Sequence, residues 1–221
     1  MPIILQKRKP ENLIYGVWEI TETEEELLKD LILSEEEKKI LNNIKLPIKR
    51  RQWISYHKLI KTLLWQNEYQ GITYNKHGKP FLRNLSFNIS VSHTENYSSA
   101  IIGKDMPVGI DIETTDNKIL KIEKKFLSAK EISLLPEINR TMVLHIMWGV
   151  KESIYKLMGM QNVIFAEDLQ ISSITDNKEN CIYCTFQKNT ITENFVAFYE
   201  IIKNMMLVYA VPENFVEHHC Y

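Results

Sequence analysis

The chain of 221 residues is long enough to bury a core in one large domain or in two smaller ones. Lys and Arg number 27 and Asp and Glu 28, and the net charge of -1 gives no overall field that attracts nucleic acid or an anionic membrane. No apolar run approaches the roughly 18 residues of a membrane span, and the first charges follow a very short apolar run, which is the wrong order for a secretory signal.

The first half of the chain predicts a strand, three helices and further strands. A strand is expected at 13–19, and the capping-box spacings that begin at Thr23 and Ser34 predict two short helices. Apolar residues recur at helical spacing over 48–70, which predicts the first long helix. A hairpin is expected at 74–81, followed by strands at 87–92 and 98–103.

The second half predicts a strand at 108–113, helices at 118–126, 128–135 and 136–158, and strand-like alternation over 163–211. Turn signals interrupt this alternation at 176–177 and 189–190. Cys181 and Cys184 form a C-x-x-C in one expected strand, where a spacing of three places them on opposite faces. No second pair exists for zinc, so we expect no metal or redox role for them. Three cysteines, an odd number, suit a reducing compartment, and we expect a cytoplasmic protein.

Two carboxylates, Asp111 and Glu113, interrupt the apolar run at 108–113. Side chains alternate along a strand, so both carboxylates are expected on the same face. Adjacent carboxylates repel each other unless a cation lies between them, and a hard divalent ion with oxygen ligands meets this need. The alternative is a solvated strand end with two surface acids, because D-x-E occurs often by chance.

The helix expected at 136–158 carries an unusual stripe. Trp148, Glu152, Tyr155 and Lys156 share one side of it at helical spacing. On this side Glu152 is a candidate to complete a metal site and Lys156 a candidate to meet an anion. The alternative is an amphipathic core helix in which Glu152 and Lys156 form an ordinary surface pair.

Five short motifs occur in order between about residues 50 and 160: GKP at 78–80, FNISVSH at 87–93, GIDIE at 109–113, FLSAKE at 126–131 and W-x-x-K-E-x-x-x-K at 148–156. Together they resemble the 4'-phosphopantetheinyl transferase superfamily, most closely its double-length, surfactin-type branch. Two positions depart from the family pattern. Gln161 stands where relatives often have the second glycine of G-x-G, and Val91 lies where many relatives run directly from serine to histidine.

An internal repeat supports a division into two related halves, 1–105 and 106–221. L-S-x-x-E helix starts occur at 33–37 and 127–131, and a tryptophan follows the serine by 19 residues in the first half and by 20 in the second. Counted from the tryptophans, three pairs then keep a common register. These pairs are Trp53 and Trp148, His57 and Glu152, and Lys61 and Lys156. We therefore expect an α+β fold of two similar halves, each with a long helix on a mostly antiparallel sheet. The resemblance implies that a pseudo-twofold axis relates the halves, that the chain acts as a monomer and that coenzyme A binds at their junction.

The resemblance also implies an activity. The family transfers the 4'-phosphopantetheine arm of coenzyme A to a serine of an apo acyl or peptidyl carrier protein, releasing adenosine 3',5'-bisphosphate. It implies that Asp111, Glu113 and Glu152 hold Mg²⁺, or alternatively Mn²⁺. Glu152 is the expected base, acting directly or through a metal-bound water, and Lys156 and Asp111 complete the expected catalytic set.

Contacts to coenzyme A are expected from cations and donors in both halves. Arg51 begins the first long helix, although a solvated helix start is nearly as good an explanation of it. Lys79 is fixed between Gly78 and Pro80 and suits the nucleotide end, and Ser92 and His93 suit the 3'-phosphate or the pyrophosphate. The full expected set is Arg51, Lys79, Pro80, Ser92, His93, Lys156 and, ranked lower, Lys151.

The segment at 118–127 combines lysines with an apolar stripe and is a candidate carrier-docking surface. The alternative is that its apolar residues face the core and its lysines are merely solvated. Two other functions use the same residues. One is a non-catalytic module that binds coenzyme A or a carrier, and the other is a magnesium-dependent nucleotide pyrophosphate hydrolase.

Overall fold

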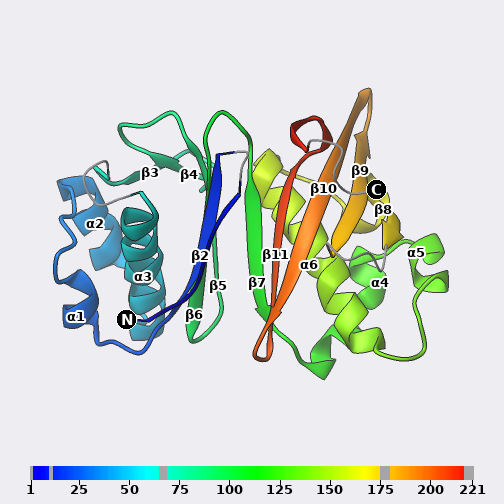
Figure 1. Cartoon of the computed structure of the whole chain (residues 1–221), viewed down its shortest axis with the longest axis horizontal. Helices are drawn as coiled ribbons and strands as arrows, with labels where there is room; N and C mark the ends of the chain where they lie inside the picture. Colours follow the sequence, from blue (N-terminus) through cyan, green and yellow to red (C-terminus); the bar gives the residue numbers. More distant parts are fainter. Residues whose placement is uncertain (1, 10–11, 65–68, 175–179, 217–221) are drawn as a thin grey trace. The chain divides into compact units, whose positions relative to one another are not determined.

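The computed structural model describes residues 2–9, 12–64, 69–174 and 180–216. The chain divides into two compact units, Met1–Pro107 and Val108–Tyr221, which are called unit 1 and unit 2 below (Figure 1). Each unit has its own hydrophobic core. Of the helices in the described part of the chain, none combines the length and the apolar character that a membrane crossing requires.

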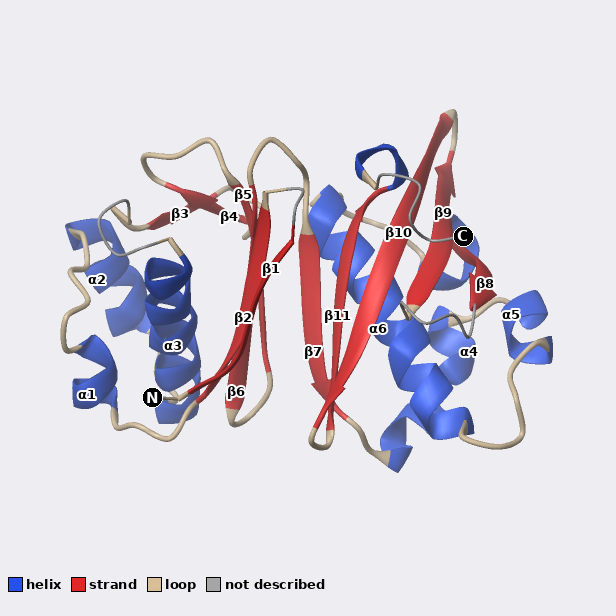
Figure 2. Ribbon diagram, in the orientation of Figure 1, coloured by secondary structure: helices blue, strands red, loops and turns tan. Residues whose placement is uncertain are grey.

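Unit 1 contains a four-stranded antiparallel sheet and one long helix (Figure 2). The strands, in spatial order, are β1 (Ile3–Lys9), β2 (Leu13–Glu19), β6 (Tyr97–Gly103) and β5 (Asn88–His93). The helices are α1 (Glu24–Leu28), α2 (Glu35–Asn43) and α3 (Pro47–Leu63), and a separate hairpin is formed by β3 (Ile72–Tyr74) and β4 (Pro80–Leu82). α3 packs against β2 and β6, and its side chains Ile54, Leu59 and Ile60 are fully buried in the core of unit 1.

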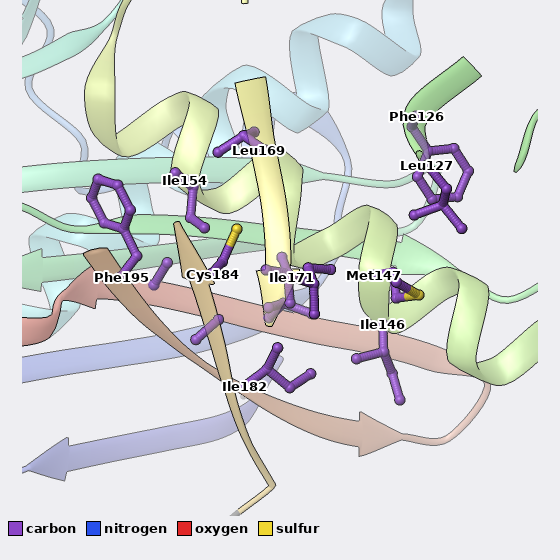
Figure 3. Packing of buried hydrophobic residues seen from close by; sticks show 14 of the residues in the cluster. Phe126, Leu127, Ile146, Met147, Ile154, Leu169, Ile171, Ile182, Cys184 and Phe195 are labelled. Carbon is purple, nitrogen blue, oxygen red and sulfur yellow. The ribbon is translucent and has the colours of Figure 1, made fainter. Parts of the chain in front are cut away.

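Unit 2 contains a five-stranded antiparallel sheet that packs against the helix α6 (Arg140–Met158). The strands, in spatial order, are β7 (Gly109–Thr114), β11 (Met205–Pro212), β10 (Ile191–Ile202), β9 (Cys181–Lys188) and β8 (Leu169–Ile174). The shorter helices are η1 (Asn117–Lys121), α4 (Glu123–Phe126), α5 (Ala129–Ser133), α7 (Phe165–Asp168) and η2 (Glu213–Phe215). Figure 3 shows part of the core, in which Ile154 of α6 and Phe195 of β10 lie among buried residues from the other elements.

The predicted α+β class, with two antiparallel sheets each packed against a long helix, is confirmed. The capping boxes at Thr23 and Ser34 are both present and begin α1 and α2, and a third at Ser128 begins α5. The strand expected at 13–19 has those bounds. The turn expected at 176–177 lies outside the described residues, whereas the turn at 189–190 joins β9 to β10.

Several helices differ from those expected, and α5, for example, ends at Ser133 and not at 135. α3 ends at Leu63 and not at 70, although positions 65–68 of the expected helix lie outside the described residues. The helix expected at 118–126 is split into η1 and α4 at Ile122. α6 begins at Arg140 and not at 136, because Asn139 has a φ of 60°, in the left-handed region that a right-handed helix excludes.

Strand β1 was not predicted. Its outer half is a run of exposed polar side chains, Gln6 to Lys9, without the apolar face that marks a buried strand. The strand lies at the edge of its sheet and is held through its backbone pairing with β2. Backbone pairing does not require particular side chains, so the sequence of this strand shows no pattern that predicts it.

Candidate active site

Two glycines allow α6 to approach the sheet of unit 2 closely. A Cβ atom on Gly109 of β7 would lie 1.8 Å from the carbonyl oxygen of Ser153, and one on Gly149 of α6 would lie 2.5 Å from Cγ2 of Val208. Both distances are far inside van der Waals contact, so a side chain at either position would push the helix away from the strands. The close approach brings polar side chains of β7 and α6 into direct contact.

The central contact of the site joins Asp111 of β7 to Lys156 of α6. The ammonium nitrogen of Lys156 lies 2.6 Å from Oδ1 of Asp111, a distance typical of a charge-assisted hydrogen bond. The Asp111 side chain is 4% exposed and the Lys156 side chain 27% exposed. Asp111 is therefore fixed inside the unit, whereas Lys156 reaches it from a partly open position.

Glu113 and Glu152 lie within electrostatic range of this pair. Burial raises the pKa of Glu113 to about 7, and the negative charge of Asp111 adds to the rise, whereas Lys156 opposes it. The pKa of Glu152 is raised first by burial and then by Asp111, and Lys156 again opposes the rise. The structure thus brings together the three predicted acids and the predicted lysine of unit 2, and these four side chains are called the carboxylate cluster below.

Trp148 takes part in this arrangement in a way that sequence analysis missed. Its ring packs against Phe126 at 5.2 Å and against Phe165 at 5.8 Å, as expected of a core residue. Its side chain also makes a hydrogen bond to Glu113, which favours the charged carboxylate and opposes the rise in its pKa. Tryptophan has an apolar body and a single N–H donor, and this combination beside a predicted acid was the available signal.

The donor set of the carboxylate cluster suits a hard divalent ion, because carboxylate oxygens are the ligands that Mg²⁺ and Mn²⁺ prefer. The side chains nevertheless do not form a finished site. In the described part of the chain, no three His, Cys, Asp or Glu side chains are grouped so that they could hold a metal ion. Instead, the ammonium of Lys156 lies on Asp111.

Lys151, the lower-ranked candidate for coenzyme A, is not part of the carboxylate cluster. It is fully buried, and its ammonium lies 2.9 Å from the carboxylate of Glu131. It also donates to three backbone carbonyl oxygens at 2.8 to 2.9 Å, those of Phe126, Phe165 and Leu169. These four acceptors give Lys151 an interior structural role.

In unit 1, one hydrogen bond links the region of Arg51 to that of His93. Gln52, next to Arg51 at the start of α3, donates from Nε2 to the carbonyl oxygen of Thr94 at 2.6 Å, and Thr94 directly follows His93. Ser92 is buried and His93 is exposed at the end of β5. Nε of Arg51 is buried, and within the described residues it has no hydrogen-bond partner. A buried guanidinium N–H without an acceptor suits an anionic ligand.

Lys79 and Pro80 lie at the β3–β4 hairpin, whose turn has a fixed backbone. The side-chain oxygen of Asn75 accepts hydrogen bonds from the backbone N–H groups of His77 and Lys79 at 2.8 and 3.0 Å. Gly78 has a φ of +82°, which a residue with a side chain rarely adopts. Lys79 is half-buried, and burial lowers its pKa.

The segment at 118–127 is partly core. Ile119 and Phe126 are buried, as the alternative explanation expected. The side chains of Lys121, Lys124 and Lys125 are exposed, and Leu120 is 39% exposed beside them. The lysines and Leu120 therefore remain accessible on the surface of unit 2.

Residues 107–203 match the sequence model of the 4'-phosphopantetheinyl transferase superfamily. The matched segment contains the whole carboxylate cluster and Trp148. It does not extend to Arg51, Lys79 or His93, and the surfactin-type branch stays a prediction. No curated protein sequence matches the chain.

Proposed function

We propose that the protein transfers the 4'-phosphopantetheine arm of coenzyme A to a serine hydroxyl of an apo acyl or peptidyl carrier protein and releases adenosine 3',5'-bisphosphate. The observation that carries the proposal is the carboxylate cluster, which brings three acids and one lysine from β7 and α6 together inside the matched domain. Gathering like charges at a half-buried site destabilises a fold, and such groups are typical of functional sites.

In this proposal Asp111, Glu113 and Glu152 would hold Mg²⁺ or Mn²⁺. When bound, the ion supplies positive charge that neutralises the pyrophosphate oxygens as the phosphorus is attacked. Lys156 supplies a second positive charge from α6. Its partly exposed side chain is long enough to leave Asp111 for a phosphate oxygen nearby.

The reaction forms a bond between the serine oxygen and the β-phosphorus of coenzyme A and breaks the bond from that phosphorus to the bridging oxygen. The bridging oxygen leaves with the bisphosphate, and the serine proton must be accepted as the new bond forms. Glu152 is the proposed acceptor. Its pKa is raised by burial and by Asp111, and a raised pKa makes a carboxylate a better proton acceptor near neutral pH.

Arg51, Lys79, Pro80, Ser92 and His93 remain the proposed contacts of unit 1 to the nucleotide phosphates. The buried Nε of Arg51 supports its inclusion, and the fixed backbone at Lys79 suits a residue that must meet a ligand in one position. Lys151 is omitted from the proposed contacts, because its ammonium is already surrounded by four protein acceptors.

The test combines the full chain with coenzyme A, Mg²⁺ and an apo carrier, using one acyl and one peptidyl carrier in separate reactions. We expect the mass of a carrier to rise by one phosphopantetheine arm, and we expect Asp111→Asn to abolish the rise. An unmodified carrier beside intact coenzyme A would identify a binding module. An unmodified carrier beside cleaved coenzyme A would identify a pyrophosphate hydrolase.

A further inference from the structure

We propose that Lys156 is an internal counter-ion that occupies Asp111 until coenzyme A draws it away, so that the divalent ion and coenzyme A bind with positive coupling. The inference rests on the proposed function, because it assigns a pyrophosphate to the same site. It adds that the binding of coenzyme A promotes the binding of the metal at that site. The protein without coenzyme A holds its metal weakly, and the co-substrate itself makes Asp111 available.

The Asp111–Lys156 ion pair can be broken by movement of the lysine but not by movement of the aspartate. Asp111 is on a central part of β7, where its backbone is paired with Val208 of β11, and its side chain is 4% exposed. Lys156 lies in the last turn of α6 with 27% of its side chain exposed, and its four-carbon stem has many rotamers. The lysine can therefore move to a nearby anion, whereas the aspartate cannot follow it.

A comparison within the same helix supports this mobility. Lys151, five positions earlier in α6, is fully buried and is held by Glu131 and three carbonyl oxygens. Moving Lys151 would leave the charge of Glu131 buried without a partner, which would destabilise the fold. Lys156 is instead half-buried beside three carboxylates that another cation can neutralise in its place.

The coupling follows from charge. A divalent ion that approaches Asp111 meets an ammonium only 2.6 Å from the same carboxylate, and the two cations repel each other. A pyrophosphate offers the Lys156 ammonium new oxygen acceptors. When the ammonium moves to them, the Asp111 oxygen becomes available to the metal. Coupling between two ligands is reciprocal, so the metal must raise the affinity for coenzyme A by the same factor.

The first experiment measures Mn²⁺ binding to the full chain without coenzyme A, by electron paramagnetic resonance of the free ion. Lys156→Met removes the ammonium and keeps most of the stem, and we expect it to bind Mn²⁺ about tenfold more tightly than the wild type. The titration is run at about pH 8.5, so that protons compete less with the metal for the carboxylates. Lys118→Met is the matched control, because it removes an exposed lysine whose nitrogen lies 3.6 Å from Asp116, and its Mn²⁺ affinity should be unchanged.

A second readout reports the same affinity without a binding titration. Without Lys156 the apo protein holds its carboxylates without a counter-ion, so Mn²⁺ should raise the melting temperature of Lys156→Met by more than that of the wild type. If Lys156→Met does not fold, Lys156→Gln, which keeps a polar head, replaces it in both measurements. Mn²⁺ affinity equal to or weaker than that of the wild type in the folded variant overturns the proposal.

The second experiment measures the coupling itself. In the wild type, saturating Mn²⁺ should lower the Kd for coenzyme A by a factor about ten times larger than in Lys156→Met, which keeps only the direct attraction between Mn²⁺ and the pyrophosphate. If the wild type modifies a carrier but its coupling is no greater than that of Lys156→Met, the inference fails and the proposed function stands. If the wild type binds neither Mn²⁺ nor coenzyme A and leaves the carrier unmodified, both fail.

Discussion

The ammonium of Lys151 lies 2.9 Å from the carboxylate of Glu131, and both side chains are buried inside unit 2. Glu131 has two further tasks. It closes the capping box of α5 by accepting from the backbone N–H of Ser128, and it accepts from the backbone N–H of Ile171 in β8. One buried carboxylate thus ties a helix start, a strand and the long helix together.

Unit 1 contains a corresponding arrangement, in which a histidine with a lowered pKa stands where unit 2 has the lysine. Glu37 closes the capping box of α2 with Ser34, is fully buried and accepts from the backbone N–H of Ile72 in β3. His57 of α3 takes the place of the lysine, with Nε2 3.7 Å from Glu37. These contacts pair His57 with Lys151, one residue away from the Glu152 that the sequence register had paired with it.

Lys151→Met should destabilise the protein by about 3–5 kcal/mol, because it leaves the charge of Glu131 buried without a partner. Urea unfolding followed by circular dichroism measures the loss. Lys118→Met, at an exposed lysine, is the control and should change the free energy of unfolding by less than about 0.5 kcal/mol. A stable Lys151→Met with weakened coenzyme A binding would instead favour the ligand role first expected of this residue.

His57 predicts a loss of stability in acid. Its Nδ1–H donates to the carbonyl oxygen of Trp53 at 2.7 Å, and burial lowers its pKa from 6.5 to about 3, so the folded protein holds the ring neutral. The unfolded chain binds this proton more readily, so the stabilisation is present above pH 6.5 and is lost as the pH falls from there toward 3. Urea titrations between those values should show a shallower loss for His57→Gln, and equal slopes in the two proteins would contradict the prediction.

The tight packing of α6 predicts that a second substitution can restore stability lost at Gly149 but not stability lost at Gly109. Gly149→Ala should cost about 1–3 kcal/mol, because its new methyl group meets the Val208 side chain. Val208→Ala removes that obstacle, so the double variant should be more stable than the two single losses predict. Gly109→Ala meets the backbone oxygen of Ser153, which no side-chain change removes, so Val208→Ala should not rescue it.

Trp148→Phe separates the two roles of the tryptophan. The phenyl ring keeps much of the packing on Phe126, but the hydrogen bond to Glu113 is lost. That bond lowers the pKa of Glu113, so its loss should raise the pKa further above about 7 and move the acid limb of Mn²⁺ binding to higher pH. Titrations of Mn²⁺ at a series of pH values measure the shift, and thermal unfolding checks that the fold is kept. An unmoved acid limb would leave Trp148 with packing alone.

The sequence predicted those features that depend on local spacing. The strand at 13–19, the capping boxes at Thr23 and Ser34 and the regular strand β7 that carries Asp111 and Glu113 follow from short patterns of polar and apolar residues. The role of Lys151 did not follow, because helical spacing cannot tell a lysine near a ligand from one whose acceptors come from Phe126, Phe165 and Leu169. Edge strand β1 was missed because its pairing is through the backbone.

The exposed lysines of the segment at 118–127 lead to a prediction about the carrier. Lys121 and Lys125 are exposed, and Leu120, which directly precedes Lys121 in the chain, is 39% exposed. A surface of lysines around an exposed apolar residue suits an acidic partner that also presents apolar side chains. Ile119 and Phe126 are buried in the core, so the docking surface would consist of the lysines and Leu120 without them.

Lys121→Glu and Lys125→Glu should therefore raise the KM for the carrier while leaving the affinity for coenzyme A unchanged. The effect should shrink at high salt, where the attraction between exposed charges is already screened. Leu120→Ser should raise the same KM by an amount that salt does not reduce, because its contribution is apolar. Steady-state kinetics with one carrier at two ionic strengths measure all three variants.

If neither charge reversal alters the KM, the carrier docks elsewhere. Arg50 is a poor substitute as a docking cation, because its guanidinium already donates to Glu24 and to the carbonyl oxygen of Leu41, so the search would turn to other exposed lysines.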